Sequence, residues 1–124
     1  MNLIDSSGWF EYFINSSNAR HFVPVIENMD ELIISPLNFF EIYKRVQREF
    51  GADEANRAVG FLKNARVVDI STSIALAAAE LSKIHHLHMA DSFLLATAQS
   101  EDAVLWTMDS HFKDIPGVQY FAKE

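Results

Sequence analysis

The chain contains no cysteine, which excludes a disulfide scaffold, a thiolate zinc site and a cysteine nucleophile. It has only 4 glycines and 3 prolines in 124 residues, so turns should be few and helices should dominate. No glycine-rich loop is present to cradle a phosphate, which removes the nucleotide triphosphate and dinucleotide classes. The apolar runs fall far short of the roughly 18 residues that span a bilayer. The amino terminus has no basic segment and meets an acid at Asp5, so we expect a cytoplasmic protein without signal peptide or membrane segment.

Positive charge is also scarce, with 10 basic residues against 17 acidic ones and a net charge of −7. Taken alone, this argues against nucleic acid as a partner, because phosphate binding draws on Lys and Arg. The distribution is uneven, however: residues 42–66 hold six basic and three acidic residues, a net charge of +3, which leaves −10 for the remaining chain. The net acidic charge of the whole chain therefore does not exclude a local basic surface over residues 42–66 that binds phosphate.

The basic residues Lys44, Arg45 and Arg48 follow Glu41 at spacings of three, four and seven residues and so share a helix face with it. One interpretation is a track for RNA phosphates that runs away from an acidic ligand. The other is a solvated basic face with pairs inside the helix, such as Arg45–Glu49. The sequence leaves both open.

Length and an apolar content of 49% fit a single globular domain over residues 1–124. Short apolar runs predict strands at 2–5, 32–34, 67–68, 103–106 and 118–121. Residues 6–8 are expected to turn the chain into a helix that runs to about residue 14. Further segments with helical periodicity or caps predict helices at 22–29, 36–50, 54–62, 72–84 and 90–100. Strands that alternate with helices indicate an α/β domain with a mainly parallel sheet.

Several helix boundaries have a clear mechanism. Ser35 can cap, and Pro36 at the first helical position lacks only an N–H that would have no partner in the helix. Gly51 is expected to end that helix and Asp53 to cap the next one, while Ser71 is expected to cap the helix that follows residue 71.

Four acidic residues stand where open α/β sheets bind ligands, outside the carboxyl ends of the strands. Asp5 follows the first strand, and Asp109 follows the 103–106 strand. Asp91 opens the 90–100 helix, and Glu41 lies in the second turn of the helix after Ser35. Each alone is compatible with a cap, a turn or a solvated helix residue, but together they predict one acidic crevice.

The segments around these acids resemble the four signatures of PIN-domain ribonucleases, and within that family the VapC-type toxins of type II toxin–antitoxin systems. They are Leu3–Ser7, Ser35-Pro36 with Glu41, Met89–Ala98 and Trp106–Phe112. The resemblance covers nearly the whole chain and implies a three-layer α/β/α fold with a short, mainly parallel sheet flanked by helices. One position departs from the pattern: many relatives carry a further acid where this chain has His111, and Asp114 is a candidate substitute.

The resemblance implies a metal-dependent endoribonuclease that hydrolyses phosphodiester bonds in RNA and is held inactive by a cognate antitoxin. Carboxylate oxygens without thiolates are ligands suited to Mg²⁺ or Mn²⁺, and two such ions would change the charge from −7 to −3. Asp5 and Asp91 are expected to be ligands, and Asp109 and Glu41 to complete the site directly or through water. The hydroxyls expected to hold these carboxylates belong to Ser6 and Thr107.

A homodimer and a groove for the antitoxin are further implications of the resemblance. We expect the groove to be lined by some of the aromatic residues near the amino terminus, which are Phe10, Tyr12, Phe13 and Phe22. A histidine cluster, His85, His86 and His88, could bind a metal or RNA but is more typical of an exposed helix end.

Two other functions are alternatives to a nuclease. A catalytically silent PIN-like interaction module is the first, but retention of all four acids argues against it, since a cluster of like charges without a metal is costly. A phosphoryl-transfer receiver or haloacid-type phosphatase is the second. Those proteins need a paired acid at the first strand or an Asp-x-Asp-x-Thr motif, and the segment Asp5-Ser6-Ser7-Gly8 has neither.

Overall fold

The computed structural model describes residues 1–124 and contains a five-stranded, wholly parallel sheet in the order β3-β2-β1-β4-β5. Its strands are β1 (Asn2–Ile4), β2 (Leu32–Ile34), β3 (Arg66–Val67), β4 (Val104–Thr107) and β5 (Val118–Tyr120). The helices are α1 (Ser6–Phe13), α2 (Val23–Ile26), α3 (Pro36–Phe50), α4 (Ala52–Leu62), α5 (Thr72–His85) and α6 (Met89–Ser100). The predicted α/β class with its parallel sheet is confirmed.

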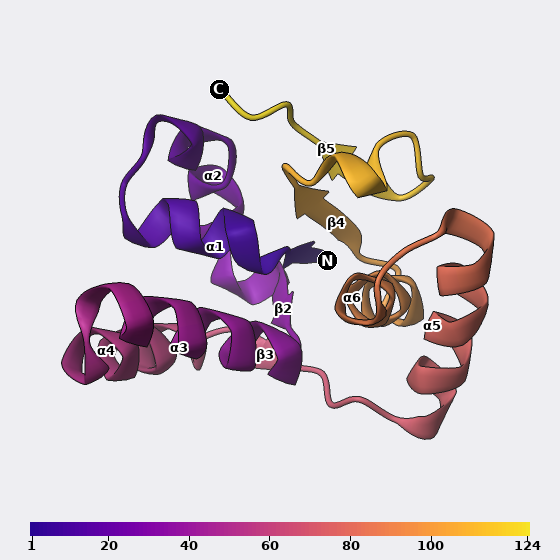
Figure 1. The fold of residues 1–124 in the computed structure, drawn as a ribbon, viewed down its shortest axis with the longest axis horizontal. Helices are drawn as coiled ribbons and strands as arrows, with labels where there is room; N and C mark the ends of the chain where they lie inside the picture. Colours follow the sequence, from indigo (N-terminus) through magenta and orange to yellow (C-terminus); the bar gives the residue numbers. More distant parts are fainter.

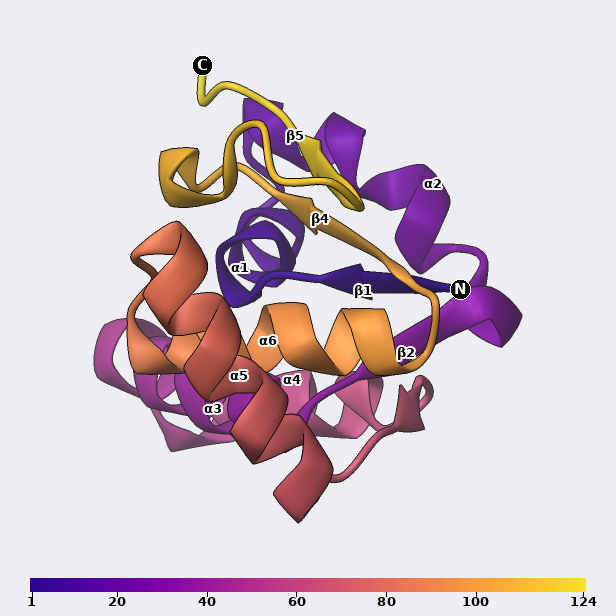
Figure 2. The same ribbon diagram turned by 90° about the vertical axis from the view of Figure 1, so that its right-hand side faces the viewer.

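Helices cover both faces of the sheet, so the fold has three layers with the sheet in the middle (Figures 1 and 2). Ile4, Leu32 and Ile34 belong to the core shared with α1, α3 and α4. The alternate strand residues Leu3, Ile33 and Leu105 belong to the core on the α6 side. Successive strand side chains point to opposite faces, so strands this short are buried on both sides and read as continuous apolar runs.

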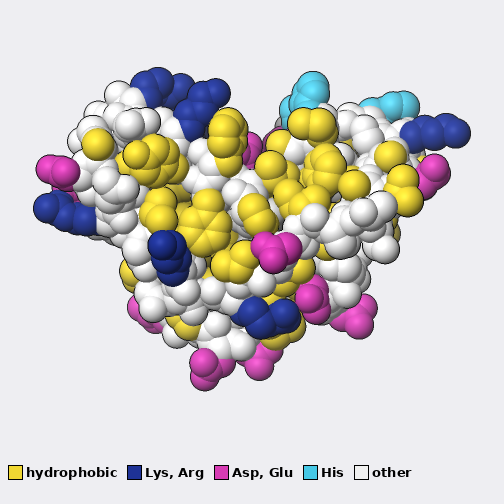
Figure 3. Space-filling model, turned by 90° about the horizontal axis from the view of Figure 1, so that it is seen from below, with side chains coloured by type: hydrophobic (Ala, Val, Ile, Leu, Met, Phe, Trp, Pro, Cys, Tyr) yellow, Lys and Arg dark blue, Asp and Glu magenta, His cyan; other side chains and the backbone are white.

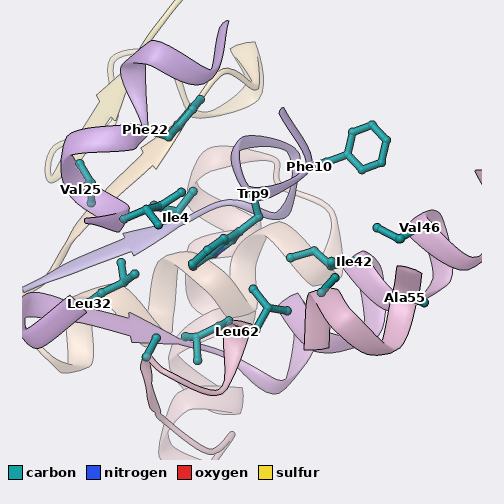
Figure 4. Close-up of a cluster of buried hydrophobic side chains, with 14 of the residues drawn as sticks. Ile4, Trp9, Phe10, Phe22, Val25, Leu32, Ile42, Val46, Ala55 and Leu62 are labelled. Atoms are coloured by element: carbon teal, nitrogen blue, oxygen red, sulfur yellow. The ribbon is translucent and has the colours of Figure 1, made fainter. Parts of the chain in front are cut away.

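Trp9 on α1 is fully buried among side chains of β1, α3 and α4 (Figure 4). The residue before it has to be glycine: a Cβ at Gly8 would stand 2.8 Å from both Ile4 Cγ2 and Phe22 Cε1. Because Gly8 brings the start of α1 close to β1, it fixes the position of the chain directly after Asp5.

Two of the expected helix caps are confirmed and one is wrong. The Ser35 hydroxyl accepts from the Leu37 amide at 3.1 Å, and the Ser71 hydroxyl accepts from the Ile74 amide at 3.1 Å. Asp53 does not cap α4; the cap is Gly51, at φ +92°, which also ends α3, so Asp53 lies inside the first turn. Glycine tolerates that backbone conformation and joins the two helices without an intervening loop.

The predicted helix over residues 22–29 is wrong in length, because regular α-helix is limited to α2 and 3₁₀ turns flank it at 17–21 and 29–31. No helix in the structure combines the length and the apolar character needed to cross a membrane.

The chain order of the sheet reverses at β1. From β1 the chain passes outward to β2 and β3, and it then returns to place β4 on the other side of β1. Ligands of open α/β sheets bind at such a reversal, outside the carboxyl ends of the strands. The structure therefore directs attention to the residues that follow β1 and β4, namely Asp5 and Asp109.

Candidate metal centre

An open cleft of about 530 Å³ lies at the carboxyl ends of β1 and β4. All four predicted acids line it, from the starts of α1 and α6, from α3 and from the segment after β4; they are Asp5, Glu41, Asp91 and Asp109. Figure 3 shows the molecule hollowed between two lobes, with Lys and Arg side chains on one rim and His side chains on the other. The positions of the four acids therefore agree with the prediction that they lie in one crevice.

Asp5 is the most buried of the four, with 7% of its surface exposed. Its Oδ2 atom accepts hydrogen bonds from the hydroxyls of Thr107 at 2.8 Å and Ser7 at 3.0 Å. Burial raises the pKa of Asp5 above its ordinary value, although both hydroxyls act against the rise, and the charge of Asp109 adds to it. Thr107 was predicted to hold a carboxylate, whereas the role of Ser7 was missed.

Glu41 is held by a chain of hydrogen bonds that begins at a buried amide. Asn38 donates from Nδ2 to Ser6 Oγ at 3.0 Å, and Ser6 Oγ donates to Glu41 Oε1 at 2.8 Å. The same Asn38 accepts from the Ser35 amide at 2.9 Å and donates to the Ile4 carbonyl at 3.3 Å. Sequence reasoning assigned Ser6 correctly as a partner of a carboxylate but missed Asn38, which joins the start of α3 to the end of β1.

Asp91 lies in the first turn of α6, where it was expected, but His88 rather than Asp91 is the cap residue. Burial raises its pKa to about 6, and the carboxylates of Asp5, Asp109 and Glu41 add to the rise. His111 acts in the opposite direction. Burial and the neighbouring Asp5 also raise the pKa of Glu41. Mutual repulsion of this kind is what a bound cation would relieve.

Asp109 begins the 3₁₀ turn over 110–112 and is fixed on both sides. Its amide donates to Thr107 Oγ1 at 2.9 Å, and its Oδ1 atom accepts from the amide of His111 at 2.9 Å. The Nδ1 atom of His111 lies 2.7 Å from the same Oδ1. Asp114 is exposed, at φ +67°, and does not line the cleft, so the suggestion that it replaces the missing acid is wrong.

The donor set fits a divalent cation. Asp91, Asp109 and His111 each offer one ligand atom, and these atoms lie within 4.8 Å of one another. Asp5 and Glu41 line the same cleft with further carboxylate oxygens. Hard oxygen donors in this number suit Mg²⁺ or Mn²⁺, which take carboxylate and water ligands.

Basic side chains stand beside the acids. The predicted Lys44, Arg45 and Arg48 all line the cleft, and so does Lys123, which the sequence did not indicate. The carboxyl-terminal segment brings Lys123 there, since the Phe121 amide donates to the Thr107 carbonyl at 2.9 Å and the Glu124 amide to Asn18 Oδ1 at 3.0 Å.

The second interpretation of the basic helix face, a solvated face with pairs inside the helix, agrees only in part with the structure. Glu49 pairs with Arg48 at 3.6 Å rather than with Arg45. The Arg45 guanidinium instead lies 3.5 Å from the centre of the Phe10 ring, a cation–π contact that holds this charge at the cleft.

A second, apolar groove of about 570 Å³ runs between α1, α3 and α4. Some of four aromatic residues were expected to line a groove, and three of them line this one, namely Phe10, Tyr12 and Phe13, together with Phe50 and Phe61. Phe22 does not, because it is fully buried in the core against β1. Density of aromatics in the sequence could not separate a core residue from a groove residue.

The histidine cluster marks the junction of α5 and α6. His85 ends α5, His86 follows in the left-handed conformation at φ +56°, and His88 precedes α6. This placement agrees with the interpretation as a helix end. His88 is the member nearest the acids, with its ring 5.7 Å from that of His111.

Comparison with known proteins gives one family and a set of related folds. Residues 3–118 match the PIN domain family, and no curated protein matches the sequence. A toxin–antitoxin complex from Klebsiella pneumoniae superposes with a TM-score of 0.80 at 24% identity, over 96% of each chain. The sarcin–ricin loop cleaving toxin VapC20 of Mycobacterium tuberculosis gives 0.78 at 14% identity, over 94% of this chain and 95% of that one. DNA-bound VapBC from Salmonella typhimurium gives 0.75 at 20% identity, over 98% of each.

Proposed function

Since the chain belongs to the PIN domain family, we propose that it is a Mg²⁺- or Mn²⁺-dependent endoribonuclease that acts in the cytoplasm as the toxin of a toxin–antitoxin pair. One observation carries the proposal: four carboxylates from four separate elements converge in a cleft that basic side chains also line. A silent interaction module would gain nothing from burying Asp5 close to three further carboxylates. The similar folds of a loop-cleaving toxin and of toxin–antitoxin complexes support the same assignment.

Each group in the cleft has a task in this reaction. Asp5, Glu41, Asp91 and Asp109 would hold the metal, which when bound polarises a phosphodiester and supports attack by water. Thr107, Ser7 and Ser6 keep the carboxylates oriented through the hydrogen bonds described above. Lys44, Arg45, Arg48 and Lys123 would hold the phosphates on either side of the bond to be cut. The acidic side chains would thus bind the metal, while the basic side chains would bind the RNA backbone.

Two surfaces fit the proposed partners. The apolar groove lined by Phe10, Tyr12 and Phe13 is the candidate site for an apolar segment of the antitoxin. For the homodimer, exposed large apolar side chains on α3, α5 and the start of α6 are available, namely Phe40, Leu76, Ile84 and Met89. Yellow side chains gather on the face between the two lobes in Figure 3.

Purified protein should cleave structured RNA when Mn²⁺ or Mg²⁺ is present and should stop when a chelator is added. Expression of the chain alone should arrest growth, and expression of a small protein encoded next to it should restore growth. RNA that stays intact under all metal conditions, with normal growth, would favour the silent interaction module instead.

Replacing two basic side chains of the cleft with acidic ones, in the double variant Lys44→Glu with Arg48→Glu, should weaken RNA binding without removing the metal site. Each lost phosphate contact should reduce the slope of log affinity against log salt by roughly 0.7 to 0.9, so the pair should reduce it by about 1.5. The measurement is RNA binding by fluorescence anisotropy at several salt concentrations. Lys63→Glu, an exposed lysine beyond α4 that does not line the cleft, is the matched control. An unchanged slope in the double variant would return these residues to a merely solvated face.

A further inference from the structure

We propose that His111 supplies a nitrogen ligand to the metal site, so that the centre is a mixed nitrogen and oxygen site that favours Mn²⁺ over Mg²⁺. The inference rests on the proposed function, because it assumes that the acids of the cleft bind a divalent cation. In the sequence, His111 is notable only because many PIN-domain ribonucleases carry an acid at its position.

The position of the imidazole supports this role. His111 Nδ1 lies 2.7 Å from Asp109 Oδ1, and ligand atoms of Asp91, Asp109 and His111 lie within 4.8 Å of one another. Adjacent donor atoms in an octahedral site with bonds of about 2.1 Å stand roughly 3 Å apart. At 2.7 Å the two atoms share a hydrogen bond, and a cation that binds both would take the place of the proton between them.

The turn that carries His111 holds it in this place. Its amide donates to the same Asp109 Oδ1 atom at 2.9 Å, and the next residue, Phe112, is fully buried in the core beside α6. The imidazole itself is 57% exposed, so it can bind a ligand without disturbing the core. The amide contact is the cap of the 3₁₀ turn, so only the contact of the imidazole with the carboxylate is specific to histidine.

The chemical consequence is a change in metal preference. Mg²⁺ strongly prefers oxygen ligands, whereas imidazole is a good ligand for transition metals, and affinities rise from Mn²⁺ along the first row. His111→Asp keeps a donor at this position but replaces nitrogen with oxygen. We expect this variant to lower the ratio of Mn²⁺ affinity to Mg²⁺ affinity by roughly tenfold.

The direct test is pulsed electron paramagnetic resonance of the protein with Mn²⁺ alone, which detects modulation of the echo by a coordinated ¹⁴N nucleus. The parent protein should show the ¹⁴N modulation, and His111→Asp should bind Mn²⁺ without it. His88→Asn removes the neighbouring imidazole, 5.7 Å away ring to ring, and should keep the modulation. A cooperative thermal transition of each variant without metal would show that it is folded.

The outcomes separate the inference from the proposed function. Mn²⁺ bound without ¹⁴N modulation, or modulation that survives His111→Asp, overturns the ligand role of His111 and leaves the nuclease proposal standing. That result would make His111 a hydrogen-bond donor that positions Asp109. Failure to bind Mn²⁺ at all would overturn both. Loss of Mn²⁺ binding in Asp91→Asn identifies the cleft as the place where the metal is held.

Discussion

Asp91→Asn should lower metal-dependent RNA cleavage by roughly a thousandfold or more and abolish growth arrest, while the protein stays folded. The metal contributes several kcal/mol of charge stabilisation in the transition state, and about 1.4 kcal/mol corresponds to a factor of ten in rate. Asp91 lies in the first turn of α6, and its charge is coupled to those of Asp5, Asp109 and Glu41. The amide has nearly the same shape but binds a cation weakly. Cleavage of a labelled RNA under single-turnover conditions measures the loss.

The matched control for this variant is Asp114→Asn. Asp114 is an exposed aspartate in the left-handed conformation, which asparagine also tolerates, and it does not line the cleft. Its substitution should leave the rate within a factor of two or so. Comparable cleavage by the Asp91 and parent proteins, or equal losses in the Asp91 and Asp114 variants, would show that the four-acid cleft is not the catalytic centre.

The strands and the four acids could be predicted because each has a local signature. Strands buried on both faces read as short apolar runs, and an acid after such a run stands at the edge of the sheet. That Asp5 and Asp109 meet follows from β1 and β4 being parallel neighbours, with Leu3 opposite Leu105. Local pattern and sheet geometry indicated where Asp5 and Asp109 lie, whereas the roles proposed for all four acids came from the resemblance to PIN-domain ribonucleases.

The residues that the sequence did not indicate depend on contacts between distant segments. Asn38 is an ordinary polar residue until the fold places it beside the Ile4 carbonyl and the Ser6 hydroxyl. Lys123 reaches the cleft only because the carboxyl-terminal segment is bonded to Thr107 and Asn18. His111 has no periodic or capping signature, and its side-chain direction is set by the turn after β4. Such roles arise from tertiary structure, which a single sequence does not display.

Without metal, the protein should be more stable to heat near pH 5 than near pH 7.5. The pKa of Asp91 is raised from 3.8 to about 6 in the fold, so between these values the native state binds more protons than the unfolded state. Stability therefore falls as pH rises through about 4 to 6 and stays low above it. The raised pKa values of Asp5 and Glu41 act in the same direction. Melting temperatures in a chelating buffer, followed by circular dichroism, give the measurement.

Added Mn²⁺ should remove most of this pH dependence, because it binds the ionised carboxylates of the folded state only. At a concentration a hundred times its dissociation constant, the ion should stabilise the protein by about 2.7 kcal/mol, or about 10 °C in melting temperature for a domain of this size. The rise should be large near pH 7.5 and small near pH 5, where protons compete with the metal for Asp91. Asp91→Asn should show a smaller fall in stability with pH and little response to Mn²⁺. A metal-free protein whose stability increases from pH 5 to 7.5 would mean that the acids of the cleft do not repel one another. A Mn²⁺ response that persists in Asp91→Asn would mean that these acids do not share a cation.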